Sequence, residues 1–240
     1  MRPPGNAHAE EELFSPPGSV PRILPLVEDE IHLWRAPLDI SEEALCVFEK
    51  ILSPDESERA GRFRFPEHRK RFIAARGILR NILGIHLDCA PVELDFAYSE
   101  YGKPRLAGLE DTQVEFNLSH SADLALYAVT FARPVGVDVE FIKANGSWLR
   151  IAEHYFTPVE FSMLSNLPEE EMRREFFALW SEKEARLKAL GVGLRYPLGD
   201  GGDDSAWSVE RLKPMPGYCG ALAFASRDTD PLIIRHHFEI

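Results

Sequence analysis

Cysteine is scarce in this chain, which limits the kinds of disulfide or metal site that the protein can contain. Three cysteines, Cys46, Cys89 and Cys219, occur among 240 residues, odd in number and far apart. This pattern excludes a disulfide framework or a cysteine-based zinc site and favours reduced thiols in the cytoplasm. Long apolar runs are missing too, since none approaches the ~18 to 20 residues that span a bilayer. The first twelve residues are polar and acidic, unlike a secretory signal peptide, so we expect neither secretion nor a membrane partner.

Positive charge is also in deficit. Lysine and arginine total 27 against 39 acidic residues, for a net charge of −12, which argues against a general nucleic-acid binder. The deficit is uneven, because the segment from Arg59 to Arg80 holds eight basic residues and a single acidic one, Glu67. A basic stripe on an acidic protein suits a small polyanionic ligand or an acidic protein surface.

One helix carries the first candidate functional residues. Strong helix formers fill residues 180–190, and Gly191 follows in the position of a C-terminal cap. Trp180, Glu184 and Lys188 recur at i, i+4 and i+8, so they lie near one face of this helix. Taken alone, a Glu–Lys pair at this spacing is typical of a solvated helix surface and contributes little to stability.

A second stretch changes that interpretation. Residues 136–140 form a short apolar run in which Asp138 and Glu140 alternate with valines. In a strand these two carboxylates point to the same face, where they repel each other unless a cation lies between them. Together with Glu184 they offer three oxygen ligands of the kind that a hard divalent ion such as Mg²⁺ prefers.

Four segments together resemble the signatures of one family, the Sfp-like 4'-phosphopantetheinyl transferases. Residues 136–140 resemble its G-(I/V)-D-(I/V)-E strand, and residues 180–188 its W-(S/T)-x-K-E-(A/S)-x-x-K helix. Residues 101–104 resemble the G-K-P turn and residues 116–121 the F-N-(I/L)-S-H-(S/T) segment. Each motif is weak alone, but four in the right order over residues 30 to 225 are specific.

The resemblance implies a fold and a domain division. The expected fold is α+β, a pseudo-dimer of two similar halves, each a helix packed on a small antiparallel sheet, with the active site in the cleft between them. Residues 29–132 would form the N-terminal half with the coenzyme A phosphate contacts. Residues 133–240 would form the C-terminal half with the metal and catalytic residues. Residues 1–28 are proline-rich, and we expect them to be disordered or loosely packed.

Local patterns predict the individual elements. We expect strands at 31–34, 94–98, 114–118, 124–131, 136–140, 207–212 and 218–226. Helices are predicted at 41–52, from 53, at 66–83 and 148–155, from 157, and at 169–190, with Ser41, Ser53 and Thr157 as N-terminal caps. The glycine-rich residues 200–204 suggest a hairpin or flexible loop, and the tail from 232 is either a strand or loose.

The resemblance also implies a reaction. Such an enzyme transfers the phosphopantetheine arm of coenzyme A to a serine of an acyl, polyketide or peptidyl carrier protein. The transfer converts apo to holo carrier and releases adenosine 3',5'-bisphosphate, often in secondary metabolite biosynthesis. Mg²⁺, or alternatively Mn²⁺, would be held by Asp138, Glu140 and Glu184. The expected catalytic residues are Asp138, Glu184 and Lys188: Glu184 removes the serine proton, directly or through a metal-bound water, and Lys188 stabilises or protonates the leaving phosphate oxygen.

Further residues are expected to bind coenzyme A. By resemblance they are Arg59, Arg71, Lys103, Pro104, Asn117, Ser119, His120, Asp138 and Lys188. The basic helix adds Arg62, Arg69, Lys70 and Arg76 as candidate phosphate contacts, because arginine matches phosphate oxygens in bidentate geometry. Glu56 departs from the family, since some members carry a basic coenzyme A contact there. Arg59 or Arg62 is then expected to take over that contact.

Two other functions compete with this hypothesis. One is a coenzyme A or carrier-protein binding module without catalysis, and the other is a magnesium-dependent phosphohydrolase that uses the same acids with water in place of serine. The intact Asp138, Glu184 and Lys188 speak against the first. For a transferase acting as a monomer, the carrier is expected to be acidic and to dock on a local basic or apolar patch near residues 143–150.

Overall fold

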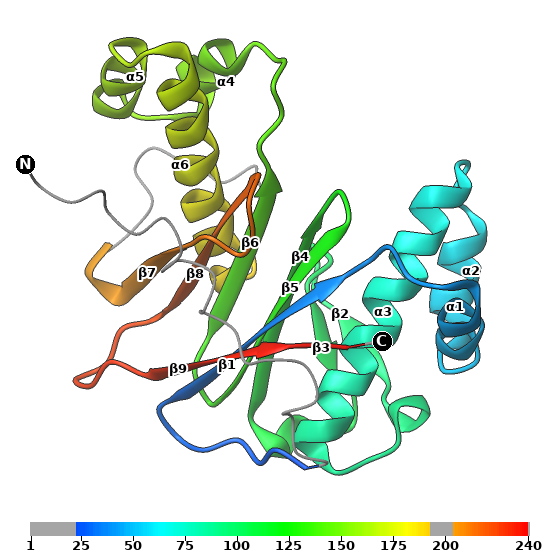
Figure 1. Cartoon of the computed structure of the whole chain (residues 1–240). Coiled ribbons are helices and arrows are strands. Elements are labelled where there is room, and N and C mark those ends of the chain that lie inside the picture. Colours follow the sequence, from blue (N-terminus) through cyan, green and yellow to red (C-terminus); the bar gives the residue numbers. More distant parts are fainter. Residues whose placement is uncertain (1–22, 193–203, 240) are drawn as a thin grey trace, which may run out of the picture.

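The computed structural model describes residues 23–192 and 204–239, which form a mixed α+β protein (Figure 1). Its strands are β1 (Glu30–Pro37), β2 (Phe96–Tyr98), β3 (Pro104–Leu106), β4 (Val114–Ser121), β5 (Leu124–Phe131), β6 (Val135–Phe141), β7 (Trp207–Leu212), β8 (Tyr218–Ala225) and β9 (Leu232–His237). Its α-helices are α1 (Glu42–Glu49), α2 (Pro54–Gly61), α3 (Pro66–Leu87), α4 (Trp148–Tyr155), α5 (Pro158–Ser165) and α6 (Glu169–Leu190). Within this part of the chain, no helix is long and apolar enough to cross a membrane.

Two main sheets organise these elements. The first has the strand order β4-β5-β1-β9, in which β5 runs antiparallel to its neighbours and β9 runs parallel to β1. The second is antiparallel, with the order β6-β8-β7. Strands β2 and β3 pair as a separate small ribbon. Figure 1 shows α3 alongside the first sheet and α6 alongside the second.

Local sequence rules account for most element ends. Helices α4 and α6 have the predicted bounds, and α6 ends at Gly191, whose φ of 74° is the left-handed conformation of a C-terminal cap. Ser41 and Thr157 accept backbone N–H groups as N-terminal caps. Helix α3 continues to Leu87, beyond the predicted end, and the tail forms strand β9. The predicted loop at 200–204 falls almost entirely outside the described residues.

The core has two principal layers. Alternating residues of β1 divide between them: Trp34 faces the cluster that includes α3, whereas Ile31 and Leu33 pack with valines of β6 in a cluster shared by both sheets. Behind β6, helix α6 approaches so closely that a Cβ on Gly136 would lie 2.1 Å from the backbone oxygen of Ala185. Glycine at position 136 therefore sets how close α6 comes to the carboxylate strand.

The ends of the predicted halves interlock. Residues 1–22 of the predicted loose extension lie outside the described residues, but Leu24 beyond them donates its backbone N–H to Ile85 across 3.1 Å and packs on the core. The division near residue 133 stays a prediction. Strand β9, which was assigned to the C-terminal half, lies in the first sheet beside β1.

Candidate active site

Strands β4 and β6 meet through side chains rather than through a backbone ladder. Asn117 Oδ1 accepts the backbone N–H of Val137 at 2.9 Å. Two residues on, the hydroxyl of Ser119 accepts the N–H of Val139 at 3.4 Å, and the hydroxyl of Ser121 accepts that of Phe141 at 3.1 Å. Alternate side chains of β4 thus satisfy alternate amides of β6, and they hold the carboxylate strand against the first sheet.

The predicted catalytic residues converge on this junction. The Nζ of Lys188 lies 2.6 Å from Asp138 Oδ1 and 2.8 Å from the Ser119 hydroxyl. That hydroxyl also donates to Asp138 Oδ1 at 2.9 Å. Asp138 is buried, whereas the Lys188 side chain keeps 27% of its exposure. Helix α6 and strands β4 and β6 therefore hold a lysine, a serine and an aspartate in mutual contact.

Two further carboxylates complete an acidic group. Burial, followed by the charge of Asp138, raises the pKa of Glu140, whose Oε2 accepts the Ser121 hydroxyl at 2.9 Å. Burial also raises the pKa of Glu184; Lys188 lowers it, while Asp138 and Glu140 raise it further. Asp138 Oδ2 and Glu184 Oε1 are buried and have no hydrogen-bond partner among the residues that the structure describes.

These acids are not gathered into a ready metal cluster. Within residues 23–192 and 204–239, no three His, Cys, Asp or Glu side chains are grouped closely enough to hold an ion. The donor set nevertheless fits a divalent cation. Asp138 and Glu184 each keep one buried oxygen without a partner among the described residues, and Lys188 is paired with the other oxygen of Asp138. Unpaired buried carboxylate oxygens are groups that a cation can coordinate.

A cavity of about 290 Å³ opens next to Lys188. The described residues of its wall include four cationic side chains, Arg59, Arg76, Lys103 and Lys188, and among these described residues there is no carboxylate. Of the other residues predicted to bind coenzyme A, Pro104, Asn117 and His120 also line it. Ser119 and Asp138 lie behind Lys188 rather than in the wall. Such a wall favours a ligand with several negative charges.

Lys103 links the two sides of this cavity. Its Nζ donates to the carbonyl oxygens of Val135 on β6 at 3.2 Å and of Ala189 on α6 at 3.4 Å, and burial lowers its pKa. His120 faces the same cavity, where its enclosure and then the charges of Lys188 and Arg71 lower its pKa. A neutral imidazole at this position can donate one hydrogen bond to a ligand oxygen without adding charge.

Most of the basic stripe is engaged elsewhere. Arg71 pairs with Asp123 at 2.7 Å and does not line the cavity. The other predicted candidates Arg62, Arg69 and Lys70 pair with Glu58, Glu49 and Glu42, respectively. Arg59 makes no ion pair among the described residues and lies over the Phe72 ring, 5.3 Å from its centroid. Arg59 and Arg76 are therefore the members of the stripe that reach the cavity.

Sequence patterns did not point to every residue of the site. Phe72 and Tyr98 line the cavity, yet neither falls in a charged or motif position. Ser121 closes the motif at 116–121 and holds Glu140, a role that the motif alone did not predict. For Ser121 a signal did exist, since it continues the alternation of Asn117 and Ser119 along β4. Trp180, on the same helix as Glu184 and Lys188, is a packing residue: it stacks on Phe176, with 6.1 Å between the ring centroids.

Fold and site together define a two-sheet α+β protein with a cationic cavity beside buried carboxylates. Comparison with known sequences gives this class a name. A model of the 4'-phosphopantetheinyl transferase superfamily matches residues 134–214, and one of the 4'-phosphopantetheinyl transferase N-terminal region matches residues 37–132. The chain therefore belongs to the 4'-phosphopantetheinyl transferase family, and this is its enzyme class.

Individual relatives agree with this assignment. The chain is 46% identical over 175 residues to the 4'-phosphopantetheinyl transferase HetI of Nostoc sp., covering 72% of this chain and 74% of that protein. It is 31% identical over 159 residues to the 4'-phosphopantetheinyl transferase Sfp of Bacillus subtilis, covering 66% and 69%. A phosphopantetheinyl transferase of Xenopus laevis is 29% identical over 167 residues, covering 66% and 55%.

Proposed function

We propose that this enzyme transfers the 4'-phosphopantetheine arm of coenzyme A to a serine of an acyl, polyketide or peptidyl carrier protein. The products are the holo carrier and adenosine 3',5'-bisphosphate. The observation that carries this proposal is the cavity wall. Over the part of the chain that the structure describes, this wall presents four cations without a carboxylate, and it includes Lys188, which pairs with Asp138. Coenzyme A carries a pyrophosphate and a 3'-phosphate, so its charge matches such a wall.

The cavity residues bind the coenzyme in this proposal. Lys103, His120 and Arg59 contact phosphate oxygens, and Pro104 and Asn117 shape the wall. Ser119 acts through Lys188, because its hydroxyl holds the ammonium in place across 2.8 Å. Arg71 reaches the ligand only if it leaves Asp123, so its role is peripheral. The cleft between the two halves of the pseudo-dimer is, on this view, the active site.

Asp138, Glu140 and Glu184 would hold Mg²⁺, with Mn²⁺ as an alternative. The two unpartnered buried oxygens, on Asp138 and Glu184, support this assignment. The ion, when bound, neutralises the charge that builds up on the pyrophosphate during transfer. Burial is the main cause that raises the pKa of Glu140 and Glu184, and the bound ion would offset the smaller contribution from repulsion among the carboxylates.

The protein's own groups account for the proton transfers. Glu184 accepts the proton of the attacking serine hydroxyl, and burial suits it to that task, since a raised pKa makes a carboxylate a stronger base. Lys188 then stabilises or protonates the phosphate oxygen of the departing adenosine 3',5'-bisphosphate. Its contact with Asp138 and Ser119 keeps the ammonium aimed at the cavity.

An exposed segment of the protein is a candidate surface for docking the carrier protein. The exposed segment 143–150, which carries Lys143 and Arg150, is the proposed docking patch for an acidic carrier. We expect the enzyme to act as a monomer in the cytoplasm. The three unpaired cysteines fit a reducing compartment, and the net charge of −12 speaks against a nucleic-acid partner.

Intact-mass spectrometry of an apo carrier tests the proposal. Incubation with the enzyme, Mg²⁺ and coenzyme A should add one phosphopantetheine, about 340 Da, and a chelator should abolish the gain. Fatty-acid, polyketide and peptide carriers are tested in parallel. No gain on any carrier, with coenzyme A still bound, would favour a binding module. Consumption of coenzyme A without a carrier would favour a phosphohydrolase.

A further inference from the structure

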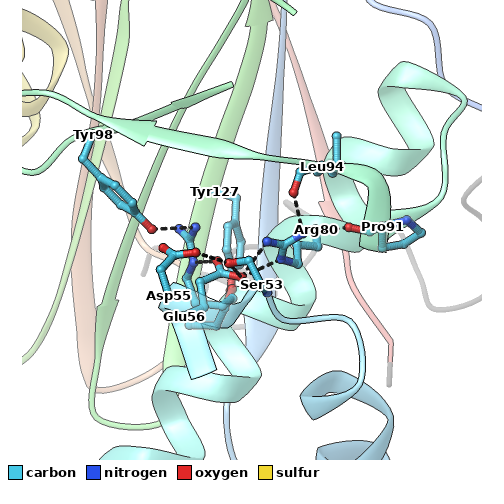
Figure 2. Close-up of polar contacts among 10 residues, drawn as sticks. Ser53, Asp55, Glu56, Arg80, Pro91, Leu94, Tyr98 and Tyr127 are labelled. Atoms are coloured by element: carbon cyan, nitrogen blue, oxygen red, sulfur yellow. Dashed lines mark hydrogen bonds and ion pairs between the residues drawn. The ribbon is translucent and has the colours of Figure 1, made fainter. Parts of the chain in front are cut away.

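A buried ion-pair cluster lies directly behind the cavity wall. Glu56 on α2 is 1% exposed, and each of its carboxylate oxygens meets a different arginine of α3: Oε1 pairs with Arg76 and Oε2 with Arg80. Figure 2 shows Glu56 beside Ser53 and Arg80, with Tyr98 on the opposite side of the cluster from Pro91 and Leu94. Glu56 thus occupies the interior, where it organises cations instead of contacting a ligand.

The two arginines have different surroundings. Arg80 is fully buried and donates to the carbonyl oxygens of Pro91 at 2.9 Å and Leu94 at 2.7 Å. Arg76 lines the cavity. Its Nε donates to Glu56 and its Nη2 donates to the Tyr98 hydroxyl at 3.2 Å, so Nη1 has no acceptor among the described residues. The Arg80 guanidinium is thereby used up inside the protein, whereas Arg76, which is 5% exposed and lines the cavity, keeps one nitrogen without an acceptor among the described residues.

The charges of the cluster also favour an anion in the cavity. One carboxylate faces two guanidinium groups, so the cluster keeps a net positive charge. Although burial alone would raise the pKa of Glu56, the two arginines and the Ser53 backbone hold it below its usual range. The carboxylate therefore stays ionised and cannot balance both cations. An anion in the cavity would supply the missing counter-charge.

The orientation of Arg76 is fixed before any ligand arrives. Its guanidinium lies over the Phe96 ring, 4.4 Å from the centroid, and is held at two nitrogens by Glu56 and Tyr98. A cation whose donors are already directed loses little rotamer freedom when it binds phosphate. Such a residue distinguishes ligands by where their phosphates lie, not only by how much charge they carry.

We propose that Arg76 is a phosphate-binding residue of this enzyme and that Glu56 and Tyr98 are its positioning residues. The proposal rests on coenzyme A being the ligand of the cavity. It also assigns a role to Glu56: this glutamate on α2 does not contact the phosphate but holds Arg76 on α3, and Arg76 supplies the positive charge. Either phosphate group of the coenzyme, the 3'-phosphate or the pyrophosphate, has the required chemistry.

Binding titrations with coenzyme A and dephospho-coenzyme A test this assignment. The Arg76→Gln variant should bind coenzyme A about tenfold or more weakly, because a charge-assisted hydrogen bond is lost. Its fold should persist, since Glu56 keeps Arg80 as a partner. Loss confined to coenzyme A would identify the 3'-phosphate as the bound group, and equal loss with both ligands would identify the pyrophosphate. Arg64→Gln, on the same stripe but outside the cavity wall, is the matched control.

Turnover separates positioning from mere structural support. Tyr98→Phe keeps the ring but removes the hydroxyl that holds Nη2, so KM for coenzyme A should rise while kcat and the melting temperature stay constant. Unchanged coenzyme A affinity in Arg76→Gln, beside normal binding by the wild-type enzyme, would overturn this inference alone. Failure of the wild-type enzyme to bind coenzyme A would overturn the proposed function as well.

Discussion

Three buried histidines should make this fold sensitive to acid. His32 on β1, His86 on α3 and His236 on β9 are 1%, 7% and 6% exposed. His32 Nδ1 lies 2.9 Å from His236 Nε2. The indole N–H of Trp34 donates to His86 Nε2 at 3.2 Å, so the proton of His86 lies on Nδ1 and is donated to the Leu24 carbonyl. Protonating His86 would set two donors face to face.

The size of the effect follows from the pKa values. Burial lowers the pKa of His32 and that of His236 to about 4. The pKa of His86 is lowered to about 3, and burial is again the main cause. In the unfolded chain these rings titrate near about 6.5, so the unfolded state binds more protons below that pH. Stability is therefore present above about pH 6.5 and is lost as the pH falls toward 4.

Between pH 7 and pH 5, each of these histidines should reduce the free energy of unfolding by about 2 kcal/mol. The simple sum for three rings is about 6 kcal/mol, which is a large part of the stability of an ordinary domain. Because His32 contacts His236, the three titrations are coupled and the sum is an order of magnitude only. Glu30, whose Oε2 lies 3.5 Å from His32 Nε2, is the charged group facing the cluster and reduces the loss.

Urea denaturation at pH 7 and pH 5 measures this quantity. The wild-type protein should lose several kcal/mol, and His236→Gln, which removes one buried titrating ring, should lose about 2 kcal/mol less. His154→Gln, at an exposed position on α4, serves as the control. An identical pH dependence in the wild type and His236→Gln would refute the reasoning.

Three further predictions concern the site and its packing. Glu184→Ala should keep the fold and lose at least about a hundredfold in kcat. The kcat of the wild-type enzyme should rise as the pH passes through the raised pKa of this carboxyl. Near-normal turnover of Glu184→Ala would contradict the role of Glu184 as the base. Ser119→Ala should lower kcat about tenfold with little change in coenzyme A affinity, because Lys188 loses the hydroxyl that positions it. Stopped-flow kinetics measures the loss in kcat, and a binding titration measures the affinity. Gly136→Ala should destabilise the protein by about 1 to 3 kcal/mol by forcing α6 off β6, whereas Gly61→Ala, with open space around it, should not; equal melting temperatures would contradict this packing argument.

Local patterns went far toward the site. The i, i+4 spacing predicts that Glu184 and Lys188 share one face of α6, and the alternation predicts that Asp138 and Glu140 share one face of β6, because each periodicity is a property of a single element. The glycine after α6 marked its end for the same reason. The contact between Lys188 and Asp138 joins these two faces of α6 and β6. Family resemblance then supplied Lys103 and His120, which no periodicity would have connected to a helix that begins only at residue 169.

What the sequence left open depends on contacts between distant elements. Glu56, Arg76 and Arg80 come from two helices, and nothing in their spacing shows that one carboxylate serves two guanidinium groups. The same holds for β9. The sequence left open whether the tail from 232 is a strand or loose. Its pairing with β1 depends on burial against the first sheet, which the tail sequence alone does not show.

The position of β9 has a consequence for how the chain folds. The outer edge of β1 is paired only by β9, a strand from the far end of the sequence, as the register Glu30↔Leu232 shows. While the chain is being synthesised, this edge of β1 stays unpaired until residues 232–237 have left the ribosome. Pairings of such long sequence separation form late, and an open edge is a template for association with other chains. Chaperone dependence and aggregation during expression should therefore concentrate at this edge, far from the chemistry of the site.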